Sequence, residues 1–120
     1  MKNNTLVIGA SENVQRYSYM AVNKLLDNGY KVYAIGKTGG KIRDVIIEKN
    51  AIELENIDTI SLYLNPKHQV TYYDYILDLN PRRVIFNPGT ENNELKKILN
   101  ENNILYEEAC TLVLLSTKQF

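Results

Sequence analysis

The fold of this chain is decided by T-L-V-I-G-A at Thr5–Ala10 and by the residues that follow it. Apolar and branched side chains run directly into small residues, as they do where a buried parallel strand enters a tight turn. Over Ser18–Asn28 apolar residues repeat at helical spacing, and Gly29 occupies the position where a helix-terminating glycine is favoured. The corner from Leu6 to Leu26 is therefore predicted to be a strand, a small-residue loop and a helix that together make a nucleotide-phosphate site.

Beyond this corner, strands and helices are expected to alternate. The expected strands are Lys31–Ile35, Val45–Ile47, Thr59–Leu64, Arg83–Phe86 and Ile104–Glu108, and the expected helices begin at Pro66, near Asn93 and at Thr111. This alternation predicts one α/β domain over residues 1–120, Rossmann-like and doubly wound, with a mainly parallel sheet, helices on both faces and right-handed crossovers.

Three local expectations complete this outline. Glu53–Ile57 is predicted to be a single helical turn, and Gly36–Gly40 a flexible loop. Asn65 is expected to cap the helix that Pro66 opens. That helix is expected to bury Val70, Tyr73 and Leu77 on one face.

Composition excludes several classes of function. Lys plus Arg and Asp plus Glu number 14 each, so no broad field favours nucleic acid or an anionic membrane, whereas a small phosphorylated ligand needs only local donors. Cys110 is the only cysteine, which rules out an intrachain disulfide and offers no zinc pattern. The segment Met1–Asn4 is too short and polar for a signal sequence, and the longest apolar run falls far below a membrane span. We therefore expect a cytoplasmic protein without a metal site.

The first loop carries the chemistry that suits a pyrophosphate. Doubly wound sheets bind ligands outside the carboxyl ends of their strands, where the first loop meets the first helix. Small residues there let backbone N–H groups approach a phosphate, and hydroxyl and guanidinium groups add donors. The predicted phosphate-binding residues are Gly9, Ala10, Ser11, Arg16 and Ser18.

This loop lacks the usual dinucleotide fingerprint. Ser11 and Val14 stand at the third and sixth positions, where G-x-G-x-x-G has glycine. The second strand ends in Gly36-Lys37, where NAD binders commonly carry an acidic residue for the ribose. Lys37 instead suggests an extra phosphate on the ligand.

Several motifs, taken in order, carry a resemblance to a known family. They are V-I-G-A-S at Val7–Ser11, Arg16 and Ser18 at the start of the helix, L-L-D-N-G-Y-K-V-Y at Leu25–Tyr33, Asn65-Pro66 after a strand, and Cys110 after the final strand. With these motifs the chain resembles the small stand-alone coenzyme A-binding domains, which are similar to the N-terminal domain of the succinyl-CoA synthetase alpha subunit.

The resemblance implies a ligand and a set of contacts. It implies that the first loop holds the phosphates of coenzyme A (CoA), that Lys37 supplies the basic residue after the second strand, and that Leu64, Asn65 and Pro66 line the adenine or pantetheine path. Relatives often have an aromatic-x-Gln-x-Gly segment after a later strand; here the segment reads Phe86, Asn87, Pro88, Gly89, and Gly89 is included among the expected cofactor contacts. Two departures are Gly36-Lys37, where relatives often have Asn-Pro, and Asn87-Pro88, which leaves that segment without its glutamine.

Three functions remain open from the sequence. The first is non-catalytic binding of CoA or an acyl-CoA, since no catalytic constellation is recognisable. The alternatives are an NAD(P)-binding module and a protein-interaction subunit with a vestigial pocket, and a homodimer or an unidentified protein partner stays open. Simpler interpretations also exist: Ser18 as a helix cap, Arg16 in a surface ion pair, Cys110 as a small buried hydrophobe and His68 as an exposed helix residue.

Overall fold

The computed structural model describes residues 3–120, so Met1 and Lys2, part of the segment expected not to be a signal, lie outside the described residues. Seven strands and five α-helices follow one another along this range. They are β1 (Asn4–Ile8), α1 (Tyr17–Asp27), β2 (Val32–Ile35), β3 (Gly40–Ile42), β4 (Val45–Glu48), β5 (Ile57–Leu62), α2 (Pro66–Gln69), the 3-10 turn η1 (Val70–Tyr72), α3 (Tyr73–Leu79), β6 (Arg83–Phe86), α4 (Asn93–Glu101), β7 (Leu105–Glu108) and α5 (Thr111–Ser116).

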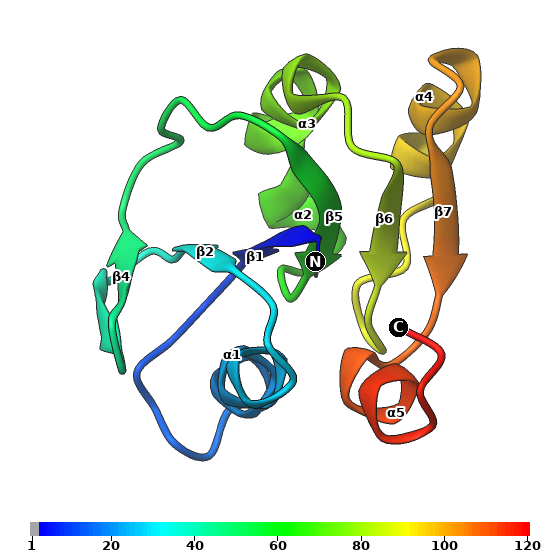
Figure 1. Ribbon diagram of the computed structural model, residues 1–120. Coiled ribbons are helices and arrows are strands. Elements are labelled where there is room, and N and C mark those ends of the chain that lie inside the picture. Colours follow the sequence, from blue (N-terminus) through cyan, green and yellow to red (C-terminus); the bar gives the residue numbers. More distant parts are fainter. Residues whose placement is uncertain (1–2) are drawn as a thin grey trace.

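All seven strands join one sheet in the order β3-β4-β2-β1-β5-β6-β7. Every neighbouring pair is parallel except β3 with β4, which is antiparallel. Helices α1 and α5 lie on one face of the sheet, and α2, α3 and α4 lie on the other (Figure 1). The predicted Rossmann-like α/β fold is confirmed.

Two hydrophobic clusters, one on each face of the sheet, hold these layers together. Along β1, Leu6 and Ile8 belong to the cluster that also contains residues of α3 and α4, while Val7 belongs to the cluster that contains residues of α1 and α5. All three side chains are fully buried. Successive side chains of a strand point to opposite faces, so a central strand covered on both sides reads as a continuous apolar run.

Two local predictions are wrong. Residues 51–56 contain no helical turn, and Ile57 already belongs to β5. The Tyr75 hydroxyl donates to the Ile52 carbonyl at 2.6 Å, and Leu54 packs against the core. Contacts with α3 and the core therefore hold this segment, whereas a helical turn would be held by hydrogen bonds within its own backbone. The expected loop Gly36–Gly40 ends in a strand, β3, which pairs with β4 as a short hairpin.

The helix predicted from Pro66 is divided into α2, η1 and α3. The 3-10 turn changes the helical phase, so Val70 is 53% exposed, whereas Gln69 and Ile76 are fully buried. Tyr73 and Leu77 pack against the core, as expected. The prediction that Val70 lies on the buried face is therefore wrong.

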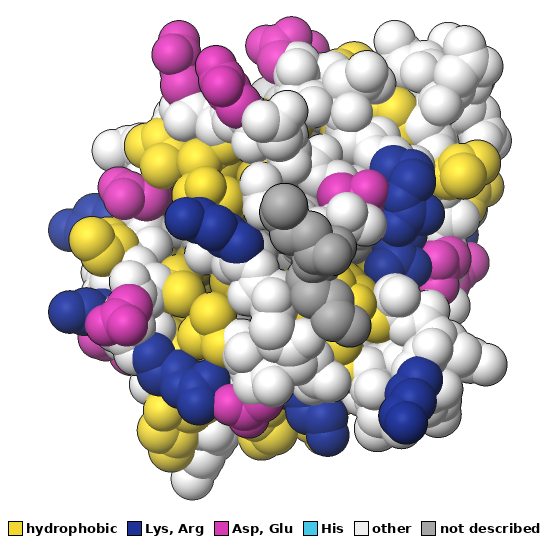
Figure 2. All heavy atoms as spheres, viewed as in Figure 1, with side chains coloured by type: hydrophobic (Ala, Val, Ile, Leu, Met, Phe, Trp, Pro, Cys, Tyr) yellow, Lys and Arg dark blue, Asp and Glu magenta, His cyan; other side chains and the backbone are white. Residues whose placement is uncertain are grey.

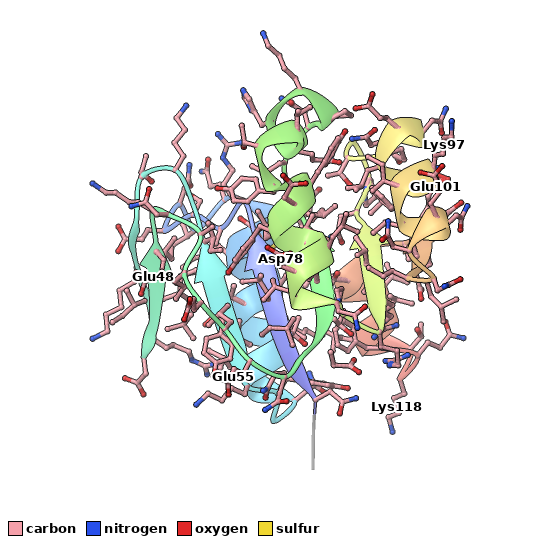
Figure 3. All side chains as sticks on the ribbon, turned by 90° about the horizontal axis from the view of Figure 1, so that it is seen from above. Glu48, Glu55, Asp78, Lys97, Glu101 and Lys118 are labelled. Atoms are coloured by element: carbon pink, nitrogen blue, oxygen red, sulfur yellow. The ribbon has the colours of Figure 1, made fainter. Side chains whose placement is uncertain are left out.

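The surface carries no single dominant charge on the face seen in Figure 2, where basic and acidic side chains are interspersed. Seen from above, α3, which carries Asp78, lies over the strands and runs along them, and α4, which carries Lys97 and Glu101, lies to its right (Figure 3). Between residues 3 and 120, no helix has the length and apolar character needed to cross a membrane.

Candidate functional site

The predicted site lies at the point of the sheet where the order of the strands reverses. From β1 the chain passes to β2 on one side, while β5 pairs with β1 on the other side. Such a switch point leaves a crevice at the carboxyl ends of the strands. A cavity of about 400 Å³ opens there, lined by Gly9, Ala10, Ser11, Arg16, Tyr17, Ser18, Lys37, Thr38, Tyr63, Leu64 and Pro88.

The structure brings most of the predicted residues to this cavity. Seven of the ten line it: Gly9, Ala10, Ser11, Arg16, Ser18, Lys37 and Leu64. Asn65 and Pro66 do not line it, because they form the start of α2, where the Asn65 side chain accepts a hydrogen bond from the His68 N–H at 3.2 Å. Gly89 is also outside this lining and donates its N–H to the Glu91 carboxylate at 2.9 Å. Contact of these three with a ligand stays a prediction.

Glycine is required at two places where backbones meet beside the cavity. Gly9 has φ +97°, and a Cβ there would lie 2.9 Å from the carbonyl carbon of Tyr63. At Gly36 a Cβ would overlap the carbonyl oxygen of Ala10 and lie 2.9 Å from the Ile47 Cγ2. The departure from Asn-Pro at Gly36 therefore has a local reason, since the first loop passes directly over this backbone.

The first two backbone donors of the loop are used within the protein. The N–H groups of Gly9 and Ala10 both donate to the Ile35 carbonyl, at 2.8 and 3.0 Å. These two N–H groups are therefore engaged within the protein, and contact of Gly9 and Ala10 with a ligand stays a prediction. Their small size still lets the loop lie close to β2 and β5 and leaves the cavity open above it.

The rest of the loop is held by its own side chains. The Ser11 hydroxyl accepts a hydrogen bond from the Asn13 N–H at 3.0 Å, and the Asn13 side chain accepts one from the Gln15 N–H at 3.0 Å. The Glu12 carboxylate turns to β3, where it accepts the Lys41 N–H at 2.8 Å. Glu12 is thereby kept out of the lining of the cavity.

Helix α1 begins at the cavity without a side-chain cap. Its N-cap residue is Arg16, which makes no capping hydrogen bond through its side chain. Ser18 lies inside the first turn and is buried, so its interpretation as the helix cap is wrong. The first N–H groups of a helix have no intrahelical acceptor, and they bind anions readily. Tyr17 and Ser18, which supply them here, both line the cavity.

The charges at the cavity are of one sign. Arg16 and Lys37 line it, and neither belongs to the ion pairs found over residues 3–120, which involve Arg43, Arg82, Arg83 and Lys96. The interpretation of Arg16 as a member of a surface ion pair is thus not supported. Within the described part of the chain, no Asp or Glu lines the cavity. An anionic ligand would meet local positive charge although the whole chain is neutral.

Tyr63 is a lining residue that no sequence pattern singled out. Its hydroxyl is buried beside Ser61 and Thr111, whose own hydroxyls are 2.8 Å apart, and it makes no hydrogen bond of ordinary geometry. Burial raises the pKa of Tyr63 to about 12, so the ring stays neutral. Tyr17, Thr38 and Pro88 were also not predicted as contacts. The only available signal was that Tyr63 lies near the end of one predicted strand and that Pro88 closely follows another.

Two further cavities adjoin the first. One, of about 290 Å³, is lined by Tyr17, Tyr63, Asn87, Pro88 and Cys110. The other, of about 240 Å³, is lined by Gly9, Gly36, Lys37, Leu64, Lys67, His68, Thr71 and Tyr72. Each shares three lining residues with the central cavity, so the three form one groove along the carboxyl ends of β2, β1, β5 and β6. We refer to all three together as the groove.

Cys110 and Asn87 close one end of the groove. Asn87 is buried, donates to the Ser61 hydroxyl and the Leu62 carbonyl, and accepts the Thr111 N–H, with distances of 2.8, 2.9 and 2.8 Å. Its amide is therefore structural, and it fixes the start of α5. Cys110, directly before α5, is partly exposed and lines the cavity, so it is not the fully buried hydrophobe of the simpler interpretation.

The fold has close relatives among solved structures. A crystal structure of an uncharacterized protein is 42% identical, covers 100% of this chain and 99% of its own, and has a TM-score of 0.97. A Thermus thermophilus protein is 20% identical, with a TM-score of 0.85 and coverage of 99% and 91%. The dinucleotide-forming acetyl-coenzyme A synthetase 1 of Ca. Korarchaeum cryptofilum is 15% identical, with a TM-score of 0.71, and the match covers 89% of this chain but 25% of that one.

The family is shown by the sequence of the chain. No curated protein matches the chain significantly. The model of the CoA binding domain family, however, matches residues 3–116, which include β1, the groove and Cys110. The chain belongs to the family of CoA binding domains.

Proposed function

We propose that this protein binds CoA or an acyl-CoA in the groove and holds it without catalysing a reaction on it. The observation that carries the proposal is the meeting of Arg16, Lys37 and the uncapped start of α1 at the switch point of the sheet. Positive charge and free backbone donors without a neighbouring carboxylate suit the phosphates of a nucleotide cofactor. Membership of the CoA binding domain family supports CoA as that cofactor.

The groove suits the two chemical halves of CoA. Arg16, Ser11 and Ser18 would hold the diphosphate at the start of α1. Tyr17, Tyr63 and Pro88 offer apolar surface in the direction of Cys110, which suits a pantetheine arm. An NAD-type ligand is disfavoured because Lys37 stands where a carboxylate would bind the ribose hydroxyls.

Support for a binding role rather than an enzymatic one comes from the separation of the reactive groups. Cys110 lines the cavity at one end of the groove, and His68 lines the cavity at the other. A nucleophile and its base need to lie within hydrogen-bond reach of each other. Most of the remaining lining is backbone, hydroxyl, cationic and apolar surface, which holds a ligand but does not activate it.

Binding of CoA is tested by thermal unfolding and calorimetric titration of the whole chain. We expect CoA to raise the unfolding temperature, because a ligand at 100 times its Kd stabilises the folded state by about 2.7 kcal/mol. Arg16→Ala should lower the affinity about tenfold, the loss of one charge-assisted contact. Arg43→Ala, which removes an exposed ion pair with Asp27, is the matched control and should bind normally.

Four results would contradict the proposal. If millimolar CoA leaves the unfolding temperature unchanged, CoA is not the ligand. If NADH binds more tightly than CoA, an NAD-type cofactor is the ligand instead. The non-catalytic role fails if incubation with acetyl-CoA releases free CoA faster than a buffer control, as followed by mass spectrometry. A stable hetero-oligomer with an empty groove would favour an interaction subunit.

A further inference from the structure

One end of the groove gathers three side chains of types that can bind phosphate. Lys37 follows β2, while Lys67 and His68 lie in α2, and all three line the cavity of about 240 Å³. None of the three belongs to an ion pair or a side-chain hydrogen bond found over residues 3–120, apart from the backbone N–H of His68. Of the described residues, no Asp or Glu lines this cavity. The charge here is thus additional to that of Arg16 in the central cavity.

The positions of these groups are set by contacts beneath them. The Asn65 side chain accepts the His68 N–H at 3.2 Å, which closes the first turn of α2. The buried Gln69 side chain donates to the Leu64 carbonyl at 2.8 Å and to the Thr90 carbonyl at 2.7 Å. On the other side, Gly36 lies directly against the first loop. The backbones that carry Lys37, Lys67 and His68 are therefore held by buried contacts on both sides of the cavity.

Lys37, Lys67 and His68 together offer more hydrogen-bond donors than a ribose hydroxyl needs. A hydroxyl is satisfied by one carboxylate or amide, whereas a phosphate monoester carries a charge of about −1.5 to −2 at pH 7 and has three strong acceptor oxygens. Lysine acts on phosphate as a point charge, and an imidazole N–H adds a directed hydrogen bond. Dephospho-CoA and NADH have no monoester on the ribose, whereas CoA has one. The cluster therefore has the chemistry to distinguish them.

We propose that Lys37, Lys67 and His68 form a subsite for a phosphate monoester on the ribose, so that the groove selects intact CoA over dephospho-CoA. The inference rests on the proposed function, because it assigns one group of that ligand to one end of the same groove. Lys67 and His68 are positioned by α2 and add specificity, while Lys37 lines both the subsite and the central cavity.

The test compares ligands and variants by calorimetric titration of the whole chain. The wild type should bind CoA at least tenfold more tightly than dephospho-CoA, since a charge-assisted contact is lost with the monoester. Lys67→Ala should weaken CoA binding about tenfold and leave dephospho-CoA binding within about twofold, so that the preference disappears. His68→Gln should lower the preference less, and Lys67→Arg should retain it.

Lys97→Ala is the control, because Lys97 lies on α4 (Figure 3) and lines none of the three cavities of the groove. Equal binding of CoA and dephospho-CoA by the wild type would overturn the subsite and leave the proposed function intact. Equal weakening of both ligands by Lys67→Ala would also overturn it, since the residue would then act on a part that the ligands share. Absence of CoA binding altogether would overturn the proposed function itself.

Discussion

At the residue scale, the geometry of the site depends on Gly36, because there is no room for a Cβ atom between this residue and the first loop. A Cβ at this position would overlap the Ala10 carbonyl oxygen and crowd Ile47. Because the Ala10 oxygen belongs to the backbone, it cannot move without shifting the first loop away from β2. The chemical identity of the residue matters less here than its lack of a side chain.

We expect Gly36→Ala to lower the free energy of unfolding by about 3 kcal/mol, the upper part of the range for overpacking in a tight site. Urea denaturation of both proteins measures the difference. Gly89→Ala is the comparison, because Gly89 has φ +92° but a Cβ added there would meet nothing within 4 Å. Strain alone should make that change cost about 1 kcal/mol. A loss at Gly36 no larger than at Gly89 would contradict the steric argument.

Tyr63 gives the second prediction at this scale, because burial raises the pKa of its hydroxyl to about 12. Above pH 10 the unfolded chain releases this proton while the folded chain keeps it, so stability falls as the pH rises from 10 towards 12. Tyr63→Phe should remove up to roughly 2 kcal/mol of this loss. Chemical denaturation between pH 9 and 11.5 measures it.

The matched control for Tyr63 is Tyr17→Phe, since Tyr17 is 69% exposed. That variant should lose stability with rising pH as the wild type does. If Tyr63→Phe follows the same curve as the wild type, the Tyr63 proton is not linked to folding in this range.

At the scale of elements, the division of the predicted helix into α2, η1 and α3 is tied to Gln69. Its amide donates to the carbonyls of Leu64 and Thr90, and its side-chain oxygen accepts from Asn92 at 2.8 Å. Gln69 is fully buried, and these bonds join the end of β5 directly to the segment before α4. A polar residue at a core position of an otherwise apolar pattern thus connects two elements that flank the groove.

Gln69→Glu keeps the shape of the side chain but removes both donors and adds a buried charge. We expect it to lower the free energy of unfolding by about 3 kcal/mol at pH 7. Part of this loss should be recovered at pH 5, where a protonated carboxyl again donates one hydrogen bond. Gln15→Glu, the same change at an exposed position, should have little effect on stability. Equal losses in the two variants would contradict a structural role for the amide.

At the scale of the whole molecule, the candidate binding site and an ion pair between neighbouring strands lie at opposite ends of the sheet. The groove lies at the carboxyl ends of the strands, whereas Asp58 and Arg82 join the amino ends of β5 and β6 through two hydrogen bonds of 2.9 and 3.0 Å. Burial acts to raise the pKa of Asp58, but hydrogen bonds from Arg82 and Thr59 and the charges of Arg82 and Arg83 outweigh it and lower the pKa below 3.8.

The stability contributed by Asp58 is therefore present above pH 3.8 and is lost as the pH falls through the lowered folded value. Asp58→Asn should reduce the difference in unfolding free energy between pH 6 and pH 3, and should leave CoA binding unchanged. Denaturation at these two pH values measures the first effect and calorimetry the second. Asp44→Asn, at an exposed turn, is the control. A loss of binding in Asp58→Asn would show that the two ends of the sheet are coupled.

The outline of the fold was predictable because its signals are local. The apolar run of β1 needs both faces covered, and the spacing in α1 and α4 is that of helices packed on one side. Of the hairpin of β3 and β4, only β4 was predicted, since Gly40 and Lys41 in β3 have no strand-like pattern. Its pairing, and its attachment to Glu12 through the Lys41 N–H, depend on residues distant in the sequence.

By itself, the sequence determined most of the order of strands and helices, the place of the first loop at the site, and the resemblance to CoA-binding domains, because each depends on residues close together in the chain. Only the tertiary structure decided that the N–H groups of Gly9 and Ala10 are used by Ile35, and that Lys67 and His68 join Lys37 in one cavity. The reason is physical: hydrogen-bond partners and cavities arise between segments that the sheet brings together, and no local pattern records which groups will meet.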